Sequence, residues 1–322
     1  MEQTAVEKKF GKYVMASMIT MFLQSAYSMI DGLFVSNLIG DTALSAVNVA
    51  WPVIAVVTAI GTGVGCGGAV MMSTKQGEGK NEESNIVRAN VILALLASSI
   101  VVTILFLVLL TPLLKLMGAE GELLRLSQIY GRVMLTGGVL QILSCGLTPL
   151  LRNDNRAVSA MMIMVGGLFV NLGLDFVFMY VFHMGIGGAA GASLCAQLFT
   201  TLCCLIILGT KKTDPIRFSQ FMIRKEYWKK IFKTAVSPFG ISLTPSLLIL
   251  YHNVACLKFG GDLAVNAYAL ISSTVGSYRV LLIGVAEGIQ PLASYAYGAH
   301  DFHAIRKIRN KAVITAIGVS FF

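Results

Sequence analysis

The sequence predicts an all-α membrane protein, a polytopic bundle of transmembrane helices. Of its 322 residues, 56% are hydrophobic and only 13% are charged, whereas a soluble domain is about 25% charged. Apolar stretches long enough to cross ~30 Å of hydrocarbon recur along the whole chain. Together with an internal repeat, these observations predict two six-helix lobes, the second of them incomplete.

The apolar segments divide the chain into two parts joined by one long polar link. Eight complete segments and the start of a ninth are predicted at 14–37, 49–73, 91–114, 124–149, 158–182, 187–209, 232–257, 264–293 and 312 onward. We expect residues 1–210 to form an N-terminal lobe with helices 1–6, and 211–233 a cytoplasmic interfacial connector. Residues 234–322 would form a partial C-terminal lobe with helices 7–9. Because the ninth segment stops inside an apolar run, we expect the chain to be truncated at its C-terminus.

The basic residues gather on alternate connections between these segments. Twenty of the 25 Lys and Arg residues lie at the N-terminus, in every second connection, or in the 211–233 connector. This asymmetry follows the positive-inside rule and predicts a cytoplasmic N-terminus in a multi-pass plasma-membrane protein. The net charge of +9 is thereby explained by topology, so we expect the lipid bilayer rather than nucleic acid as a partner, and a monomer.

An internal repeat relates the two parts. The constant shift that places Gly40 on Gly261, applied without a gap, also superimposes Asp41 on Asp262, Gly63 and Gly67 on Gly284 and Gly288, and Ser73 and Gly77 on Ser294 and Gly298. We call this displacement the repeat shift. Each half starts on the same side of the membrane, so the repeat has parallel topology. Transporters built in this way hold substrate between or within the halves and alternate access by rocking them.

Four ionisable residues lie deep in apolar segments, where a charge is costly, so their presence suggests a functional role: Asp31, Asp175, Arg279 and Glu287. An Asp at the centre of a membrane helix costs about 2.5–3.5 kcal/mol, and such residues usually face a cavity on an ion or proton path. Asp31 ends a polar stripe on the first helix. Its members follow helical spacing and are Gln24, Tyr27, Ser28 and Asp31.

Asn171 and Asp175 are spaced i, i+4 on the fifth helix, so their side chains share one face. An amide that donates to a carboxylate can tune its affinity for a proton or sodium. Ser193 and Gln197 repeat the spacing on the next helix. We predict that Asp31, Asn171 and Asp175 bind the coupling cation, with sodium as one candidate. The predicted cavity residues are Gln24, Tyr27, Ser193, Gln197 and Glu287.

Glu287 lies eight residues, about two turns, from Arg279 on the eighth helix. The sequence leaves open an indirect pair between them, a snorkelling Arg279, or a cavity-facing Glu287. No GxSxG, HExxH or paired Cys/His arrangement occurs in the sequence. We therefore expect no enzyme and no cofactor beyond a coupling ion, H⁺ or Na⁺.

The chain resembles the multidrug and toxic compound extrusion (MATE) family, in its bacterial drug-efflux branch. The resemblance covers essentially the whole chain and is carried by MIDGLFVSNLIGDTALSAVNVAWP, GTGVGCGGAVMMSTKQGEGKNEES, LLRNDNRAVSAMM, NLGLDFVFMY and EGIQPLASYAYGAHDFHAIRK. It implies a twelve-helix, V-shaped bundle that exports organic cations or amphipathic xenobiotics in exchange for protons or sodium. By position, the family's ion site corresponds to Gln24, Tyr27, Asp31, Asn171, Asp175 and Ser193.

Two positions depart from the family pattern, which commonly has Gln at Glu287 and Asn at Ala296. A carboxylate at 287 could contribute to binding cationic substrates in the C-terminal lobe. The alternative function is a flippase of lipid-linked precursors or polysaccharides, related in fold. A flippase would have a larger, cationic central cavity, whereas the buried ionisable residues here are mainly acidic.

Overall fold

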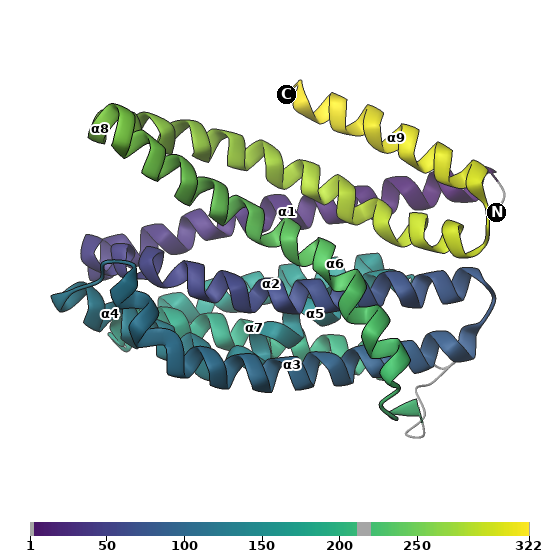
Figure 1. Ribbon diagram of the computed structural model, residues 1–322, viewed down its shortest axis with the longest axis horizontal. Helices are drawn as coiled ribbons and strands as arrows, with labels where there is room; N and C mark the ends of the chain where they lie inside the picture. Colours follow the sequence, from purple (N-terminus) through teal and green to yellow (C-terminus); the bar gives the residue numbers. More distant parts are fainter. Residues whose placement is uncertain (1–2, 211–219, 322) are drawn as a thin grey trace.

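The computed structural model describes residues 3–210 and 220–321, all joined into one helical bundle (Figure 1). Side chains at 3–8, 27–29 and 33, and at many positions between 250 and 277, lie outside this description. The elements are α1 (Gln3–Ile39), α2 (Asp41–Gly77), α3 (Asn81–Leu116), α4 (Gly121–Thr136), α5 (Gly138–Asn153), α6 (Ala157–Asp175), the π-helix η1 (Phe176–Val181), α7 (Gly185–Gly209), α8 (Lys225–Gly298) and α9 (Phe302–Ser320).

The predicted all-α membrane fold is confirmed. Among the described residues, five helical stretches are long and apolar enough to cross a bilayer: α1 from Lys9, α2, α3, α6 with η1, and α7. The pair α4 and α5 makes a sixth span if its two bent parts are taken together. These six correspond to the first six predicted segments, and we call α1–α7 the N-terminal lobe and α8–α9 the C-terminal lobe.

The predicted segment 124–149 corresponds to two helices, because the chain bends by 58° between α4 and α5. The bend falls at Gly137 and Gly138, and glycine pairs are a common cause of sharp helix kinks. A Cβ at Gly137 would overlap the side chain of Leu194 on α7. Across the break, Gln141 Nε2 donates to the Met134 carbonyl oxygen at 2.6 Å, which satisfies a backbone group that the bend frees.

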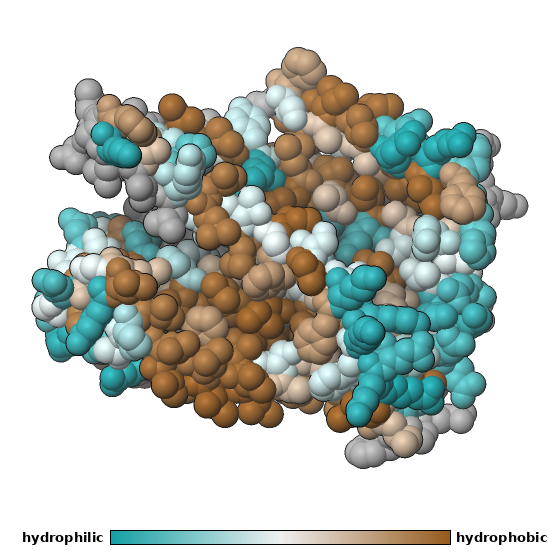
Figure 2. Space-filling view, viewed as in Figure 1, coloured by the Kyte–Doolittle hydropathy of each residue, from teal (hydrophilic) through white to brown (hydrophobic). Residues whose placement is uncertain are grey.

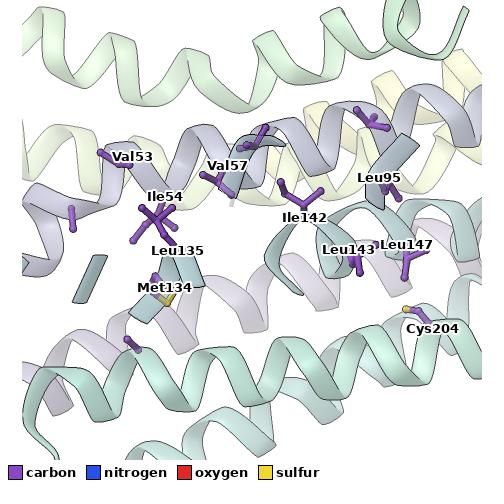
Figure 3. Close-up of a cluster of buried hydrophobic side chains, with 14 of the residues drawn as sticks. Val53, Ile54, Val57, Leu95, Met134, Leu135, Ile142, Leu143, Leu147 and Cys204 are labelled. Carbon is purple, nitrogen blue, oxygen red and sulfur yellow. The ribbon is translucent and has the colours of Figure 1, made fainter. Parts of the chain in front are cut away.

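A core of fully buried aliphatic side chains holds α2, α3, α4, α5 and α7 together (Figure 3). Ile54 and Val57 of α2 lie against Leu135 of α4 and Ile142 of α5 in this cluster. A second cluster joins α1 to the C-terminal lobe. It contains Phe10, Tyr13 and Val14 of α1, Val285, Leu292 and Ala296 of α8, and Ala304, Ile308 and Ala312 of α9. The first helix therefore packs against both lobes.

The helix α8 folds back on itself and forms two arms (Figure 1). Ala235 lies against Gly67 of α2, and Tyr295 lies against Gly77. A straight helix would hold Ala235 and Tyr295 about 90 Å apart, whereas the two glycines are separated by only about 15 Å of α2. The two arms correspond to the separate segments predicted at 232–257 and 264–293, and the first arm begins at Lys225, inside the predicted connector.

The predicted repeat is visible in the contacts between the lobes. A Cβ at Gly67 of α2 would lie 2.7 Å from the backbone nitrogen of Ala235 on the first arm of α8. A Cβ at Gly288 on the second arm would lie 2.6 Å from the Cα of Val14 on α1. The repeat shift relates Gly67 to Gly288 and Val14 to Ala235, so the two contacts are equivalent. The two lobes therefore meet through corresponding helix pairs.

The larger hydrophilic surface lies at one end of the bundle, beside a broad apolar band (Figure 2). This end holds the α2–α3 and α8–α9 turns (Figure 1) and, through hydrogen bonds to α2 and α1, the α5–α6 turn. It carries Lys75, Lys80, Arg152 and Arg156, and we call it the basic end. The apolar band is the surface expected to face lipid.

Candidate functional site

Asp175 is a fully buried carboxylate at a break in helix geometry. It is the last residue of α6 and has no exposed surface, and the π-helix η1 begins at the next residue. Asn171 Nδ2 donates to Asp175 Oδ2 at 3.0 Å, so the two side chains lie as their i, i+4 spacing predicts. Short π-helical turns are frequent at functional sites because they re-aim neighbouring side chains. The buried charge is thus placed where the helix is least regular.

Asp31 and Asp175 converge on Tyr130 of α4. Both carboxylates are close enough to act electrostatically on the Tyr130 hydroxyl, although they come from α1 and α6. Tyr130 is 5% exposed, and Asp31 Oδ1 is buried with no hydrogen-bond partner among the described residues. Two carboxylates, from α1 and α6, therefore lie within electrostatic range of a phenol on α4.

Tyr130 was not predicted from the sequence. It lies on a different helix from either carboxylate, and no spacing along the chain connects it to Asp31 or Asp175. Only the three-dimensional approach of α4 to α1 and α6 identifies it. A tyrosine in an apolar span was the one available signal, since a buried hydroxyl usually needs a polar partner.

The other predicted cavity residues of the N-terminal lobe lie on α7 and α1. Ser193 and Gln197 are partly buried on α7, and Gln197 Oε1 is buried without a hydrogen-bond partner among the described residues. α7 packs closely on α6, where a Cβ at Gly167 would lie 2.7 Å from Thr200 Oγ1. Gln24 is exposed, and the side chain of Tyr27 lies outside the described part of the structure.

The groups that the described contacts place near one another here are the Asp175 and Asp31 carboxylates, the Asn171 amide and the Tyr130 hydroxyl. Within the described residues, no group of three or more His, Cys, Asp and Glu side chains could hold a metal ion. Oxygen donors of this kind suit hard cations or protons rather than transition metals. The cation-coupling role of Asp31, Asn171 and Asp175, including sodium binding, stays a prediction.

Glu287 lies on the second arm of α8 and pairs with an arginine of the N-terminal lobe. Its Oε2 is 2.5 Å from Nη1 of Arg152 in the last turn of α5. Arg279, two turns away on α8, is partly buried and its Nε has no hydrogen-bond partner among the described residues. The carboxylate at 287 therefore faces the boundary between the lobes, and its charge is matched by Arg152.

The α5–α6 turn, residues 152–156 within the LLRNDNR motif, contacts four helices. Besides Arg152, Asp154 Oδ2 accepts from Arg88 of α3 at 3.3 Å and its Oδ1 accepts from Gln76 of α2 at 3.2 Å. Asn155 has a left-handed backbone (φ 65°), which Asn tolerates, and accepts from the Tyr13 hydroxyl of α1 at 2.7 Å. Sequence reasoning assigned these arginines only to membrane orientation and missed their buried partners.

Comparisons with known proteins agree with this architecture. A MatE family model matches residues 16–177 and 241–322. The multidrug export protein MepA of Staphylococcus aureus is 25% identical over 322 residues, which are 99% of this chain and 70% of MepA. MepA of Staphylococcus saprophyticus has the same identity and coverage.

Solved structures share the fold at similar identity. An outward-facing multidrug resistance MATE family transporter of the MOP superfamily has a TM-score of 0.92 and 26% identity, over 98% of this chain and 70% of that one. A MOP superfamily transporter from Pyrococcus furiosus, with reverse polarity of its binding pocket, has the same scores and coverage. Because the family model covers well over half of the residues, the chain belongs to the MatE family of membrane transporters.

Proposed function

We propose that the protein is a secondary active multidrug efflux antiporter that exchanges protons or sodium for organic cations or amphipathic xenobiotics. The observation that carries this proposal is the buried Asp175, hydrogen-bonded by Asn171 at 3.0 Å and sharing the Tyr130 region with Asp31. A buried ionisable group in a membrane helix is typical of ion and proton pathways. The likeness to MepA, a multidrug export protein, supports the substrate class.

Asp31 and Asp175 would bind the coupling ion, and Asn171 would orient the Asp175 carboxylate. Binding of one monovalent cation would offset the repulsion between the two carboxylates and draw α1 toward α6, while its release would let the helices separate. α1 also packs on α8 and α9 through Tyr13 and Val14. A movement of α1 caused by ion binding at Asp31 would therefore shift the contacts at the boundary between the lobes. This is the physical link that we propose between ion occupancy and access.

The repeat supports placing the coupling site in the N-terminal lobe alone. The repeat shift places His252 at the position of Asp31 in the second half. His252 Nδ1 lies 2.7 Å from the Leu248 carbonyl oxygen and its ring stacks on Tyr268 at 4.9 Å. These contacts are typical of a packing histidine, so the second lobe lacks the carboxylate of the first.

The basic end would face the cytoplasm, because Lys and Arg are enriched in cytoplasmic connections. The beginning of α1 lies at this end, close to the α8–α9 turn (Figure 1). With this orientation, the α5–α6 turn and the Arg152–Glu287 pair lie on the side from which substrates are captured.

The function is tested by loading proteoliposomes that contain the protein with a fluorescent organic cation and imposing one gradient at a time, of pH or of sodium. An antiporter moves the cation faster when either gradient is present. Transport of a fluorescent lipid-linked sugar, with no gradient-driven transport of the cation, would instead support the flippase alternative. The gradient that accelerates transport identifies the coupling ion.

A further inference from the structure

The Arg152–Glu287 ion pair joins the two lobes at 2.5 Å. Arg152 is nearly buried, with 8% of its side chain exposed, while 24% of the Glu287 side chain is exposed. Arg152 Nη1 also lies 3.4 Å from Ser17 Oγ of α1. The guanidinium thus belongs to the N-terminal lobe, and the carboxylate reaches it from the C-terminal lobe.

The guanidinium is held incompletely. Its Nε has no hydrogen-bond partner among the described residues. A cavity of about 10 Å³, lined by Ser17, Thr20, Thr148 and Arg152, lies beside it, and such a volume has room for about one water. An arginine fork fully matched to a carboxylate would use two N–H groups. Here one N–H holds the carboxylate, so a competing cation has to replace a single charged contact.

The backbone beside Glu287 is fixed at the lobe boundary. Gly284 and Gly288 lie on either side of Glu287 along the helix and contact α1 closely. A Cβ at Gly284 would lie 2.8 Å from the Cα of Met18, and one at Gly288 would lie 2.6 Å from the Cα of Val14. The Glu287 backbone is therefore held against α1 for as long as these contacts persist.

Packing alone does not require a carboxylate at this position. The repeat shift places Cys66 of α2 at the position of Glu287. Cys66 is buried and uncharged, between Gly63 and Gly67, which make the equivalent close contacts with the first arm of α8. The same packing motif therefore works with a small apolar residue, and the charge at 287 needs another explanation.

We propose that Glu287 is a substrate-capture residue for organic cations and that the Arg152 guanidinium occupies it in the absence of substrate. A cationic group of the substrate would replace Arg152 on the carboxylate, and the released lobes would then part at the basic end. This inference rests on the proposed export of organic cations. It makes opening depend on the charge of the substrate, so neutral compounds of equal size would open the protein poorly.

The first test measures binding of tetraphenylphosphonium to the purified protein. Glu287→Gln should weaken binding about tenfold, because the cation loses its carboxylate. Arg152→Gln should strengthen binding by a similar factor, because the competing guanidinium is gone. Glu226→Gln, which breaks only an exposed pair with Lys230 at the start of α8, should leave the affinity unchanged. Equal affinity in all four proteins would overturn the proposal.

The second test follows opening of the lobes through Ser73→Cys, in a protein whose six native cysteines are replaced. Ser73 is 1% exposed and donates to the Pro291 carbonyl oxygen of α8 at 3.1 Å, so it reports on the lobe boundary. Tetraphenylphosphonium should accelerate its labelling by a water-soluble maleimide severalfold. In the Glu287→Gln variant, labelling of Ser73→Cys should be fast, and adding tetraphenylphosphonium should not change its rate.

A reversed pair keeps the test decisive where a single variant folds poorly. Arg152→Glu combined with Glu287→Arg should restore slow labelling of Ser73→Cys but abolish its acceleration by tetraphenylphosphonium. Retained acceleration would mean that the pair only ties the lobes together and that the cation binds elsewhere. Both readouts use binding and labelling, so they are independent of gradient-driven efflux, which tests the proposed function separately.

Discussion

Gly77 of α2 and Gly298 of α8 lie against each other at the basic end, and each is the other's counterpart in the internal repeat. A Cβ at Gly77 would lie 3.0 Å from the carbonyl carbon of Gly298 and would overlap the carbonyl oxygen of Tyr295. A Cβ at Gly298 would overlap the carbonyl oxygen of Thr74, the repeat counterpart of Tyr295. The contact is therefore symmetric, and it closes the boundary between the lobes at this end.

Gly77→Ala should destabilise the closed arrangement, because α2 would have to move away from the α8 backbone. Forcing extra atoms into a packed contact costs about 1–3 kcal/mol. We expect a lower melting temperature and faster labelling of Ser73→Cys. The control is Gly11→Ala on α1, where an added Cβ meets nothing within 4 Å. Equal melting temperatures for the two variants would contradict the close contact.

Breaking the buried pair between Arg88 and Asp154 should be strongly destabilising. Their side chains are 1% and 0% exposed, and Asn85 also holds Arg88, accepting from Nη2 at 2.7 Å. Removing one member of a buried pair costs about 3–5 kcal/mol because the other charge is left without compensation. Arg88→Met should therefore lower thermal stability in detergent far more than Glu78→Gln, which removes only solvent-exposed pairs.

Glu78, in the α2–α3 turn, gives a weak dependence of stability on pH. Hydrogen bonds first from Lys75 and then from Lys80 hold the pKa of its carboxyl below the ordinary value. The contribution of the ionised Glu78 carboxylate to the free energy of unfolding is therefore fully present above the unfolded-state pKa. It is lost as the pH falls through the lowered folded-state pKa. Comparing melting temperatures of the protein and Glu78→Gln across the acidic range should show a small difference that vanishes at low pH.

Tyr130→Phe should impair coupling without unfolding the protein. The Tyr130 hydroxyl lies within electrostatic range of both carboxylates. We therefore expect its removal to slow gradient-driven efflux by roughly tenfold, which corresponds to about 1.4 kcal/mol. Tyr180→Phe is the matched control, because Tyr180 is 56% exposed on η1. Efflux at the same rate in both variants would remove Tyr130 from the site.

The regular parts of the molecule could be predicted from local sequence. Apolar length gave the six spans of the N-terminal lobe, and helical spacing gave the Asn171–Asp175 contact. The repeat shift anticipated the equivalent contacts of Gly67 and Gly288, because close helix packing needs small residues at fixed positions. Each of these signals lies within one segment or in its repeat.

Features that depend on two distant helices could not be predicted in this way. Glu287 was compared with Arg279, its neighbour in sequence, whereas its partner is Arg152, 135 residues away. Tyr130 lies on a different helix from Asp31 and Asp175, and no spacing along the chain indicates that α4 approaches α1 and α6. Periodicity reports which face a residue occupies but not which helix covers that face.

The central claim is that the Asp175 carboxylate couples an ion gradient to efflux, and one measurement tests it directly. Proteoliposomes with the protein, Asp175→Asn or Asp41→Asn are loaded with a fluorescent organic cation, and a pH or sodium gradient is imposed. Asp41 is an exposed aspartate bonded by Ser36 and serves as the control. We predict that Asp175→Asn still binds the cation but loses acceleration by the gradient, while Asp41→Asn behaves as the unmodified protein. Unchanged gradient-driven efflux in Asp175→Asn would contradict the assignment.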